Sequence, residues 1–261
     1  MINKKIEKII KKKNKNKIVS LTAYSTSIAK ILDKYCDITL VGDSMANVLY
    51  GMRNTHKIKL NTIIEHSIGV KKGVKKSLLV VDMPKGSYQN PNQAKKNAKL
   101  IFKKTKCDAI KIESNTKNFK IIKEIKKAKI PVMGHIGYTP QFNNSFKVKG
   151  KNTKEINKLI KEAMSIEKAG AFSIVLECVT PLAAKTITNR LKIPTIGIGS
   201  SSYCDGQILV TDDILGLSGF YPKFVKKYIN LNAIIEKVVK QYSKDVKKKI
   251  FPKNKNFLYG K

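Results

Sequence analysis

The sequence has no tryptophan, two arginines, four cysteines and no apolar run of the length that crosses a membrane. A transmembrane helix needs about 20 consecutive apolar residues, so we expect neither a membrane protein nor a membrane partner. The widely spaced cysteines form no CxxC pair, which is typical of reduced thiols in a cytoplasmic protein; they are Cys36, Cys107, Cys178 and Cys204. Residues 1–17 are rich in lysine but lack an apolar segment, so we do not expect them to be a secretory signal.

Acidic residues are also scarce, because 18 Asp and Glu stand against 53 Lys and Arg, for a formal net charge of +35. Such a charge can indicate binding to nucleic acid or to an acidic membrane. Here the basic residues are almost all lysines scattered among Asn and Ile, and aromatic residues are not interleaved with them as a base-stacking surface requires. We therefore interpret the charge as spread over solvated positions and expect no specific nucleic acid partner. A lysine-rich nucleic-acid-binding protein remains the non-enzyme alternative.

What the sequence does contain is a series of short apolar runs, each ending in a residue with reactive chemistry. The runs and their ends are 38–41 with Asp43 and Ser44, 78–81 with Asp82, 109–112 with Glu113, 132–134 with His135, and 174–176 with Glu177. Further strands are expected at residues 18–23, 195–199 and 207–210. Helical patterns separate the runs, which favours parallel strands alternating with helices.

A chain of 261 residues suits one α/β barrel, with two small domains as the weaker option. We therefore predict an α/β fold, a (β/α)8 TIM barrel, as a single domain over residues 18–261 with a helical C-terminal tail. Residues 1–17 are expected to form a basic, helical lead-in.

The acids at the strand ends predict a metal site. Parallel strands place their carboxyl ends on one rim, where TIM-barrel enzymes keep their active sites. Asp43, Asp82 and Glu113 would meet there as hard oxygen ligands, which suit Mg²⁺ with several waters retained. Each acid alone could instead be a helix cap, but several successive strands ending in this way are poorly explained by caps alone.

Other polar residues near these ends have more than one interpretation. Alternation along the strand places Lys111 on the same inward face as Glu113, and a buried lysine needs an anion. That anion could be a substrate carboxylate or a structural partner, either Glu113 or Asp82. Ser44 could bond a substrate oxygen or cap the following turn, and His135 could contact a ligand or hydrogen-bond a rim loop.

Glu177 differs from the other acids because it ends a very apolar strand, beside Cys178 and Val179. Apolar surroundings raise the pKa of a carboxyl group toward the range that is useful for a general base. Glu177 is therefore the candidate for proton abstraction.

Taken together, these motifs resemble one known family from about Ile18 to the C-terminal region. The matching segments, in family order, are Val41–Ser44, Val81–Pro84, Lys111–Glu113, Gly134–Gln141, Leu176–Val179, Ile196–Gly199 and Cys204–Gln207. Each segment alone is unspecific, but the combination closely resembles the 3-methyl-2-oxobutanoate hydroxymethyltransferases, also called ketopantoate hydroxymethyltransferases. Three positions depart from the family pattern, since Lys85 replaces an aromatic residue, Lys151 an arginine and Ser201 a glycine.

The resemblance implies a barrel of the phosphoenolpyruvate/pyruvate type, assembled as a homodecamer. It implies transfer of a hydroxymethyl group from the co-substrate 5,10-methylenetetrahydrofolate to 3-methyl-2-oxobutanoate, giving 2-dehydropantoate in pantothenate biosynthesis by Mg²⁺-assisted enolate formation. The implied roles are Mg²⁺ binding for Asp43, Asp82 and Glu113, substrate binding for Asp43, Ser44, Asp82 and Lys111, and proton acceptance for Glu177. A related barrel lyase acting on another 2-oxo acid is an alternative, but its Lys-Lys-Cys-Gly-His-type loop is not found.

Overall fold

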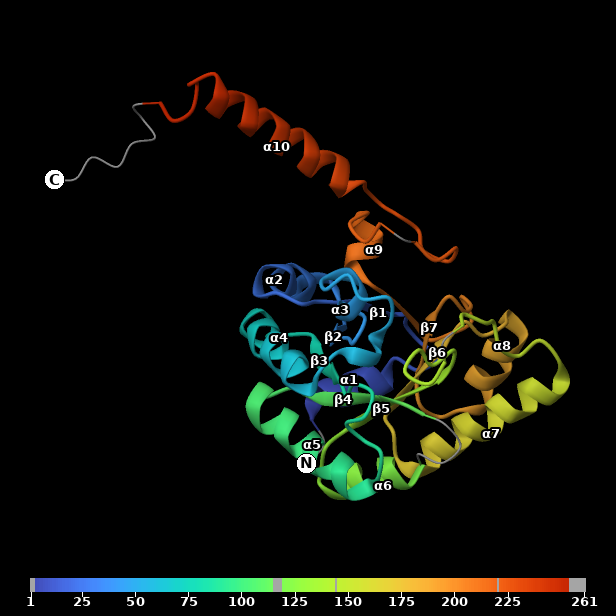
Figure 1. The fold of residues 1–261 in the computed structure, drawn as a ribbon. Helices are drawn as coiled ribbons and strands as arrows, with labels where there is room; N and C mark the ends of the chain where they lie inside the picture. Colours follow the sequence, from blue (N-terminus) through green and yellow to red (C-terminus); the bar gives the residue numbers. More distant parts are fainter. Residues whose placement is uncertain (1–2, 115–118, 144, 220, 254–261) are drawn as a thin grey trace. The chain divides into compact units, whose positions relative to one another are not determined.

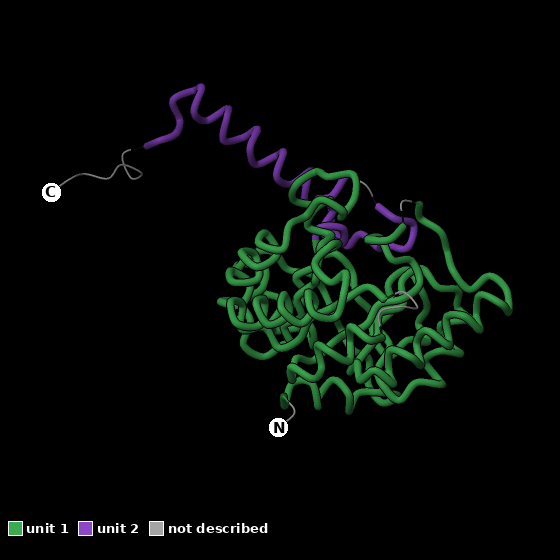
Figure 2. The backbone as a smooth tube through the Cα atoms, turned by 60° about the horizontal axis from the view of Figure 1, so that its bottom comes forward, with its two compact units in different colours: residues 1–211 green, residues 212–261 purple. Residues whose placement is uncertain are grey.

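The computed structural model describes residues 3–114, 119–143, 145–219 and 221–253. The chain divides into two compact units, residues 1–211 and residues 212–261, drawn in green and purple in Figure 2. Each unit is described by itself, and the expectation of one domain over residues 18–261 stays a prediction.

Within the described part of the first unit, eight parallel strands pair in chain order and close into a barrel (Figure 1). The strands are β1 (Ile18–Thr22), β2 (Ile38–Val41), β3 (Leu78–Asp82), β4 (Ala109–Glu113), β5 (Val132–Gly137), β6 (Ser173–Glu177), β7 (Thr195–Ile198) and β8 (Gly206–Leu209). β1 closes the circle by pairing with β8, with Ile18 in register with Gly206. The predicted (β/α)8 barrel is confirmed.

Helices alternate with the strands and surround them. They are α1 (Lys4–Lys11), α2 (Thr26–Tyr35), α3 (Met45–Val48), the 3-10 helix η1 (Thr55–Lys57), α4 (Leu60–Gly73), α5 (Pro91–Thr105), α6 (Phe119–Lys127), α7 (Thr153–Ala169) and α8 (Pro181–Arg190). A further helix, α9 (Thr211–Leu215), begins at the last residue of this unit and otherwise belongs to the second. α7 shows how the sequence sets their ends. Asn152 caps its N-terminus by accepting from the Glu155 amide, and Gly170 ends it in a left-handed conformation (φ 96°).

Two apolar clusters stabilise this unit. One lies between the strands and the surrounding helices, and the other fills the barrel interior with alternate residues of the strands, such as Leu40, Val80 and Val175. Ile6 and Ile9 of α1 belong to the interior cluster, together with residues at the first positions of several strands. The lead-in helix therefore packs against the N-terminal end of the barrel, which leaves the carboxyl ends of the strands for the site.

Ion pairs also hold the lead-in in place. Three of its lysines contact aspartates that precede or begin strands at this end of the barrel: Lys5 with Asp108 (3.3 Å), Lys12 with Asp37 (2.5 Å) and Lys13 with Asp205 (2.8 Å). Part of the lysine content thus has a structural use in the fold.

The second unit contains α10 (Leu231–Lys247), whose Asn230 cap accepts from the Ala233 amide. No residue of α10 is buried, and Ile234, Val238 and Tyr242 are among its exposed apolar side chains. Among the described residues, no helix has the length and apolar character needed to span a membrane.

Candidate active site

The carboxyl ends of neighbouring strands bring the predicted polar residues together. Strand register places Asp82 beside Lys111, Glu113 beside His135, and Gly137 beside Glu177. Asp43 follows β2, which pairs with β3. Asp43, Asp82, Lys111, Glu113 and His135 are all buried, so any charge on them must be balanced within the site.

Lys111 forms an ion pair with Asp82. The sequence analysis left either Glu113 or Asp82 as the structural partner of this lysine, and the structure selects Asp82. Lys111 Nζ lies 2.9 Å from Asp82 Oδ1, while Asp82 Oδ2 accepts from the Asp43 amide at 3.0 Å. Burial raises the pKa of Asp82 to about 6, although the charge of Lys111 opposes this. Burial acts to lower the pKa of Lys111, but the charges of Asp82 and Asp43 outweigh it and hold the pKa above its ordinary value. Lys111 therefore brings a fixed positive charge into the site.

Ser44 directly precedes α3, in the N-cap position, but its side chain makes no capping bond, so the interpretation as a cap is wrong. Its hydroxyl instead lies 2.8 Å from the hydroxyl of Tyr24, which follows β1 by two residues. The Tyr24 carbonyl in turn bonds His66 Nδ1 at 2.8 Å. The sequence analysis did not identify Tyr24 as a site residue, because nothing local signals that its side chain reaches Ser44.

His135 stands between two carboxylates. Its Nε2 lies 3.1 Å from Glu177 Oε2, and its Nδ1 lies 3.8 Å from Glu113 Oε1. Burial lowers the pKa of His135 well below its ordinary value, and the charge of Lys111 adds to this effect. The imidazole is therefore neutral and can donate one hydrogen bond and accept one. The ring nitrogens of His135 thus face two carboxylates on neighbouring strands, and not only a rim loop.

Glu177 has the elevated pKa expected from its apolar surroundings. Burial raises the pKa to about 8, and Lys111 opposes the rise. Its side chain is nevertheless 15% exposed, against 2% for Asp82 and 1% for Glu113. Glu177 is thus the acid with the most access to an incoming substrate.

The backbone around Glu177 is closely constrained. Gly137 has a φ of +96°, and a Cβ at this position would lie 2.1 Å from the Glu177 carbonyl oxygen. That carbonyl accepts from the Tyr138 amide at 2.8 Å, and Cys178 has a φ of +51°. Only glycine fits this approach of β5 to β6.

Gln141 is a second residue that the sequence analysis did not single out, although it ends the motif Gly134–Gln141. It is 1% exposed, its side chain donates to Asp43 Oδ2 at 2.8 Å, and its amide donates to Glu113 Oε2 at 2.9 Å. Its place after the His135 strand, in a loop of the same rim, is the one signal that could have indicated it.

Lys85, one of the three positions that differ from the family pattern, contacts a histidine at the rim. Lys85 Nζ lies 3.2 Å from His56 Nδ1, and His56 Nε2 lies 2.8 Å from the Pro140 carbonyl oxygen. These contacts connect the loops after β2, β3 and β5 at the rim.

The carboxylates fit a magnesium ion that is completed by other ligands. Among the described residues, no group of three or more His, Cys, Asp and Glu side chains is arranged to hold a metal by itself. Oxygens of Asp43, Asp82 and Glu113 already accept from protein donors. Because Mg²⁺ is usually held by one or two carboxylates together with waters and substrate oxygens, this donor set suits such a site. The three-ligand assignment stays a prediction.

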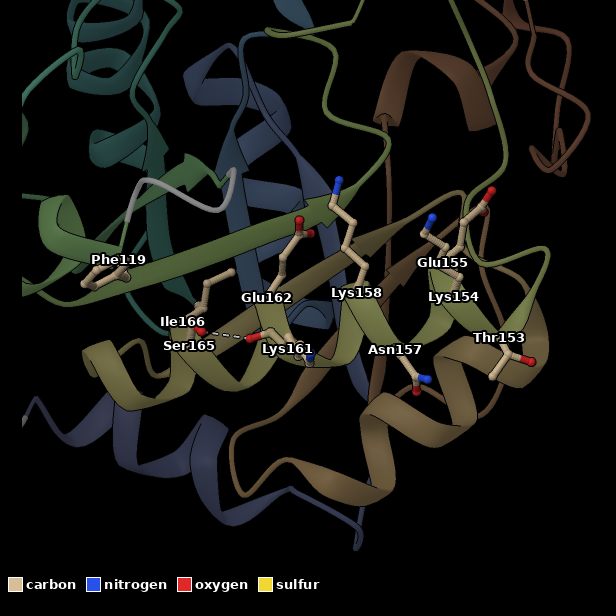
Figure 3. Close-up of a pocket in the computed structure, with 10 residues that line it drawn as sticks. All are labelled: Phe119, Thr153, Lys154, Glu155, Asn157, Lys158, Lys161, Glu162, Ser165 and Ile166. Atoms are coloured by element: carbon tan, nitrogen blue, oxygen red, sulfur yellow. Dashed lines mark hydrogen bonds between the residues drawn. The ribbon is translucent and has the colours of Figure 1, made fainter.

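A surface pocket of about 790 Å³ lies elsewhere, along α7, and is lined by Phe119, Thr153, Lys154, Glu155, Asn157, Lys158, Lys161, Glu162, Ser165 and Ile166. Figure 3 shows these side chains, most of them on one helix. None of the predicted site residues lines this pocket, so it is separate from the barrel rim.

Comparisons with known proteins identify the family. The model of the ketopantoate hydroxymethyltransferase family matches residues 3–254. The chain is 52% identical over 255 residues to a 3-methyl-2-oxobutanoate hydroxymethyltransferase of Pelagibacter ubique, covering 98% of this chain and 99% of the relative. It is 46% identical to the enzyme of that name from Bartonella quintana, covering 92% and 89%.

Solved structures of low sequence identity share the fold. The crystal structure of phosphoenolpyruvate phosphomutase from Streptomyces platensis has a TM-score of 0.64 at 12% identity, covering 94% of this chain and 87% of that one. 2,3-Dimethylmalate lyase, described as a member of the PEP mutase/isocitrate lyase superfamily, has a TM-score of 0.61 at 13% identity, covering 97% and 92%. These likenesses agree with the closed (β/α)8 barrel of this chain.

Proposed function

The chain belongs to the ketopantoate hydroxymethyltransferase family, and we propose that it transfers a hydroxymethyl group from 5,10-methylenetetrahydrofolate to 3-methyl-2-oxobutanoate. The product is 2-dehydropantoate, in pantothenate biosynthesis. The relatives' name and the family match support the reaction type. The observation that carries the chemistry is Glu177, a partly exposed acid with a pKa near 8 that lies 3.1 Å from a neutral His135.

The substrate's negative charge has a matching partner in the site. Lys111 is buried and carries a positive charge beside Asp82, close to where a 2-oxo acid would bind. We assign Asp43, Ser44, Asp82 and Lys111 to holding the oxo acid, with the Ser44 hydroxyl oriented by Tyr24. A charge-assisted hydrogen bond from Lys111 to the substrate would orient the carboxylate.

Asp43 and Asp82, with Glu113, would hold Mg²⁺. The ion, when bound, supplies Lewis-acid stabilisation of negative charge on the oxygens of the oxo acid. The carboxylates keep it at the rim, and Lys111 limits the net negative charge that the buried acids would otherwise carry.

Glu177 acts as the base. It removes the proton from C3 of the oxo acid, and the resulting enolate carbon attacks the methylene carbon of the folate as one of that carbon's two C–N bonds breaks. Water then replaces the second folate nitrogen and supplies the hydroxyl oxygen, and the folate leaves as tetrahydrofolate. A pKa near 8 matches proton abstraction close to neutral pH, because the strength of the base and its ionised fraction are then balanced. His135 places Nε2 close to the Glu177 carboxylate. Because burial keeps the imidazole neutral, it adds no positive charge that would lower the pKa of this base.

We also propose that the chain acts in the cytoplasm as a homo-oligomer, with the decamer of its family as the expected assembly. Sedimentation of the purified chain tests the decamer directly, and a monomer at micromolar concentration would contradict it.

The test of function is exchange of the C3 proton of 3-methyl-2-oxobutanoate in D₂O, followed by NMR with Mg²⁺ present and folate absent. We expect exchange that depends on enzyme and on Mg²⁺, and formation of 2-dehydropantoate when the folate is added. Exchange with another 2-oxo acid but not with this one would favour the lyase alternative instead. Binding of DNA that falls steeply with salt and ignores sequence would report bulk charge alone.

A further inference from the structure

We propose that Gln141 is a positioning residue that fixes the Asp43 carboxylate together with that of Glu113, and thereby sets the affinity of the site for a divalent cation. This inference rests on the proposed function, because it assumes that these carboxylates hold Mg²⁺.

The side chain of Gln141 is fully engaged. Its Nε2 donates to Asp43 Oδ2 at 2.8 Å and to the Met83 carbonyl at 3.1 Å, and its Oε1 accepts from the Tyr88 hydroxyl at 2.5 Å. The Met83 carbonyl and the Asp43 carboxylate can only accept hydrogen bonds, so the amide must turn its NH₂ group toward them. The orientation of the amide is therefore determined by its neighbours.

The backbone of Gln141 adds a second carboxylate to the same unit. Its amide donates to Glu113 Oε2 at 2.9 Å, so one residue contacts an acid after β2 and an acid of β4. The Met83 carbonyl, directly after β3, lies between these two strands in the barrel order. Gln141 thus connects three neighbouring strand ends from a loop that follows β5.

The connection determines which oxygen of Asp43 is presented to a ligand. The terminal torsion of an aspartate is broad, so an unrestrained carboxylate can rotate. Gln141 holds Oδ2, and no hydrogen bond from a described residue reaches Asp43 Oδ1. Loss of such an outer partner typically weakens metal binding by about 10–100-fold.

A purely structural role makes a different prediction. A buried, fully bonded glutamine stabilises the fold, so its replacement lowers the melting temperature under either interpretation. Only the positioning role requires that cation affinity falls in a variant that is still folded.

The experiment uses the whole chain and Mn²⁺ as a spectroscopic probe, with free Mn²⁺ measured by EPR and Mg²⁺ added as competitor. Gln141→Leu removes all three side-chain bonds, and Gln141→Asn keeps the amide but shortens its reach. Thr188→Val is the matched control, because it removes a buried 2.8 Å contact with Thr195 away from the rim. Thermal unfolding monitors the fold of each variant.

We expect Gln141→Leu to weaken Mn²⁺ binding by about 10–100-fold, and Thr188→Val to keep the wild-type affinity. If Gln141→Leu does not fold, Gln141→Asn and Tyr88→Phe decide, since each disturbs the same amide more gently. Wild-type affinity in folded Gln141 variants would overturn the positioning role and leave the proposed function standing. A wild-type chain that binds no Mn²⁺ or Mg²⁺ would overturn the metal assignment itself, and the role of Gln141 with it.

Discussion

His135 Nε2 lies 3.1 Å from Glu177 Oε2, and the two residues have pKa values shifted in opposite directions by the same burial. The imidazole is kept neutral, while the carboxyl group has a pKa of about 8. A neutral imidazole can accept from protonated Glu177, or donate to it once the proton is lost and the Nε2–H tautomer is present. The contact can therefore be kept in both states of the base.

Replacement of Glu177 by glutamine tests the base directly. Glu177→Gln preserves shape and hydrogen bonding but cannot accept a proton, so we expect C3 exchange to fall by about 10²–10⁴-fold. Binding of Mg²⁺ and of the oxo acid should remain, because Asp43, Asp82 and Lys111 are unchanged. NMR of deuterium incorporation, without folate, provides the measurement.

The matched control is Glu162→Gln. Glu162 also has a raised pKa from burial, but it lies on α7 in the surface pocket of Figure 3. The Glu162→Gln variant should catalyse C3 proton exchange at the wild-type rate. Wild-type exchange in Glu177→Gln would transfer the role of base to another group, with His135 as the nearest one.

The pH dependence follows from the same pKa. Glu177 is active as a base only when ionised, so exchange at limiting substrate should rise with pH and level off above about 8. Below that value the rate should fall by about tenfold per pH unit. Rates measured from pH 6 to pH 9.5 test this, and a flat profile would show that another group removes the proton.

The contribution of Glu177 to folding stability changes with pH in the direction opposite to its activity. A carboxyl whose pKa is raised from 4.5 in the unfolded chain to about 8 in the fold favours folding below pH 4.5, and this contribution is lost as the pH rises through 8. Glu177→Gln should therefore become more stable relative to the wild type as the pH increases over this range. Urea unfolding at pH 5 and pH 9 gives the comparison.

Lys111→Met keeps length and removes the charge that faces Asp82. We expect binding of the oxo acid to weaken, since hydrogen bonds to charged groups contribute about 1.5–3 kcal/mol. Calorimetric titration with 3-methyl-2-oxobutanoate measures the change. Unchanged affinity in a folded variant would return Lys111 to a purely structural role.

The double variant Lys111→Met with Asp82→Asn separates the two roles of the pair. Lys111→Met alone leaves a buried carboxylate without its partner, which costs about 3–5 kcal/mol. Removing both charges should recover part of that stability, whereas substrate affinity should stay low. Recovery of both quantities would mean that Lys111 serves only to balance Asp82.

The strands and their polar ends could be predicted from the sequence because the information is local. An apolar run followed by an acid specifies both a buried parallel strand and a residue at the rim, which holds for Asp82 and Glu177. Gln141 and Tyr24 could not be found in this way. Gln141 reaches Asp43, 98 residues earlier, only after the barrel has closed and its loops have folded over the rim.

The lead-in is an intermediate case. Its lysines were interpreted as solvated charge, and a helix was expected there. The apolar residues Ile6 and Ile9 were a signal of an inward face at helical spacing, but their partners lie at the N-terminal ends of distant strands. A buried partner such as Asp205 can be recognised only from the fold.

The last prediction concerns that buried pair. Lys13 Nζ lies 2.8 Å from Asp205 Oδ2 and also donates to the Thr188 carbonyl. Burial alone would raise the pKa of Asp205, but the bond from Lys13 and backbone amides outweigh it, and the pKa is lowered. A lowered pKa means that the stabilisation is present above the unfolded value of 3.8 and is lost as the pH falls through the folded value.

Lys13→Met should therefore destabilise the fold by about 3 kcal/mol at pH 7, as expected when one partner of a buried pair is removed. The difference from the wild type should shrink as the pH is lowered toward 3, because the buried Asp205 carboxyl no longer needs a cation once it takes up a proton. Lys12→Met is the control, because the Lys12–Asp37 pair is more exposed, with side chains 30% and 25% accessible, and should cost at most about 1 kcal/mol. Urea unfolding of the three chains at both pH values measures these differences. Equal, small losses for both variants would mean that apolar packing of Ile6 and Ile9, and not the buried ion pair, holds the lead-in helix to the barrel.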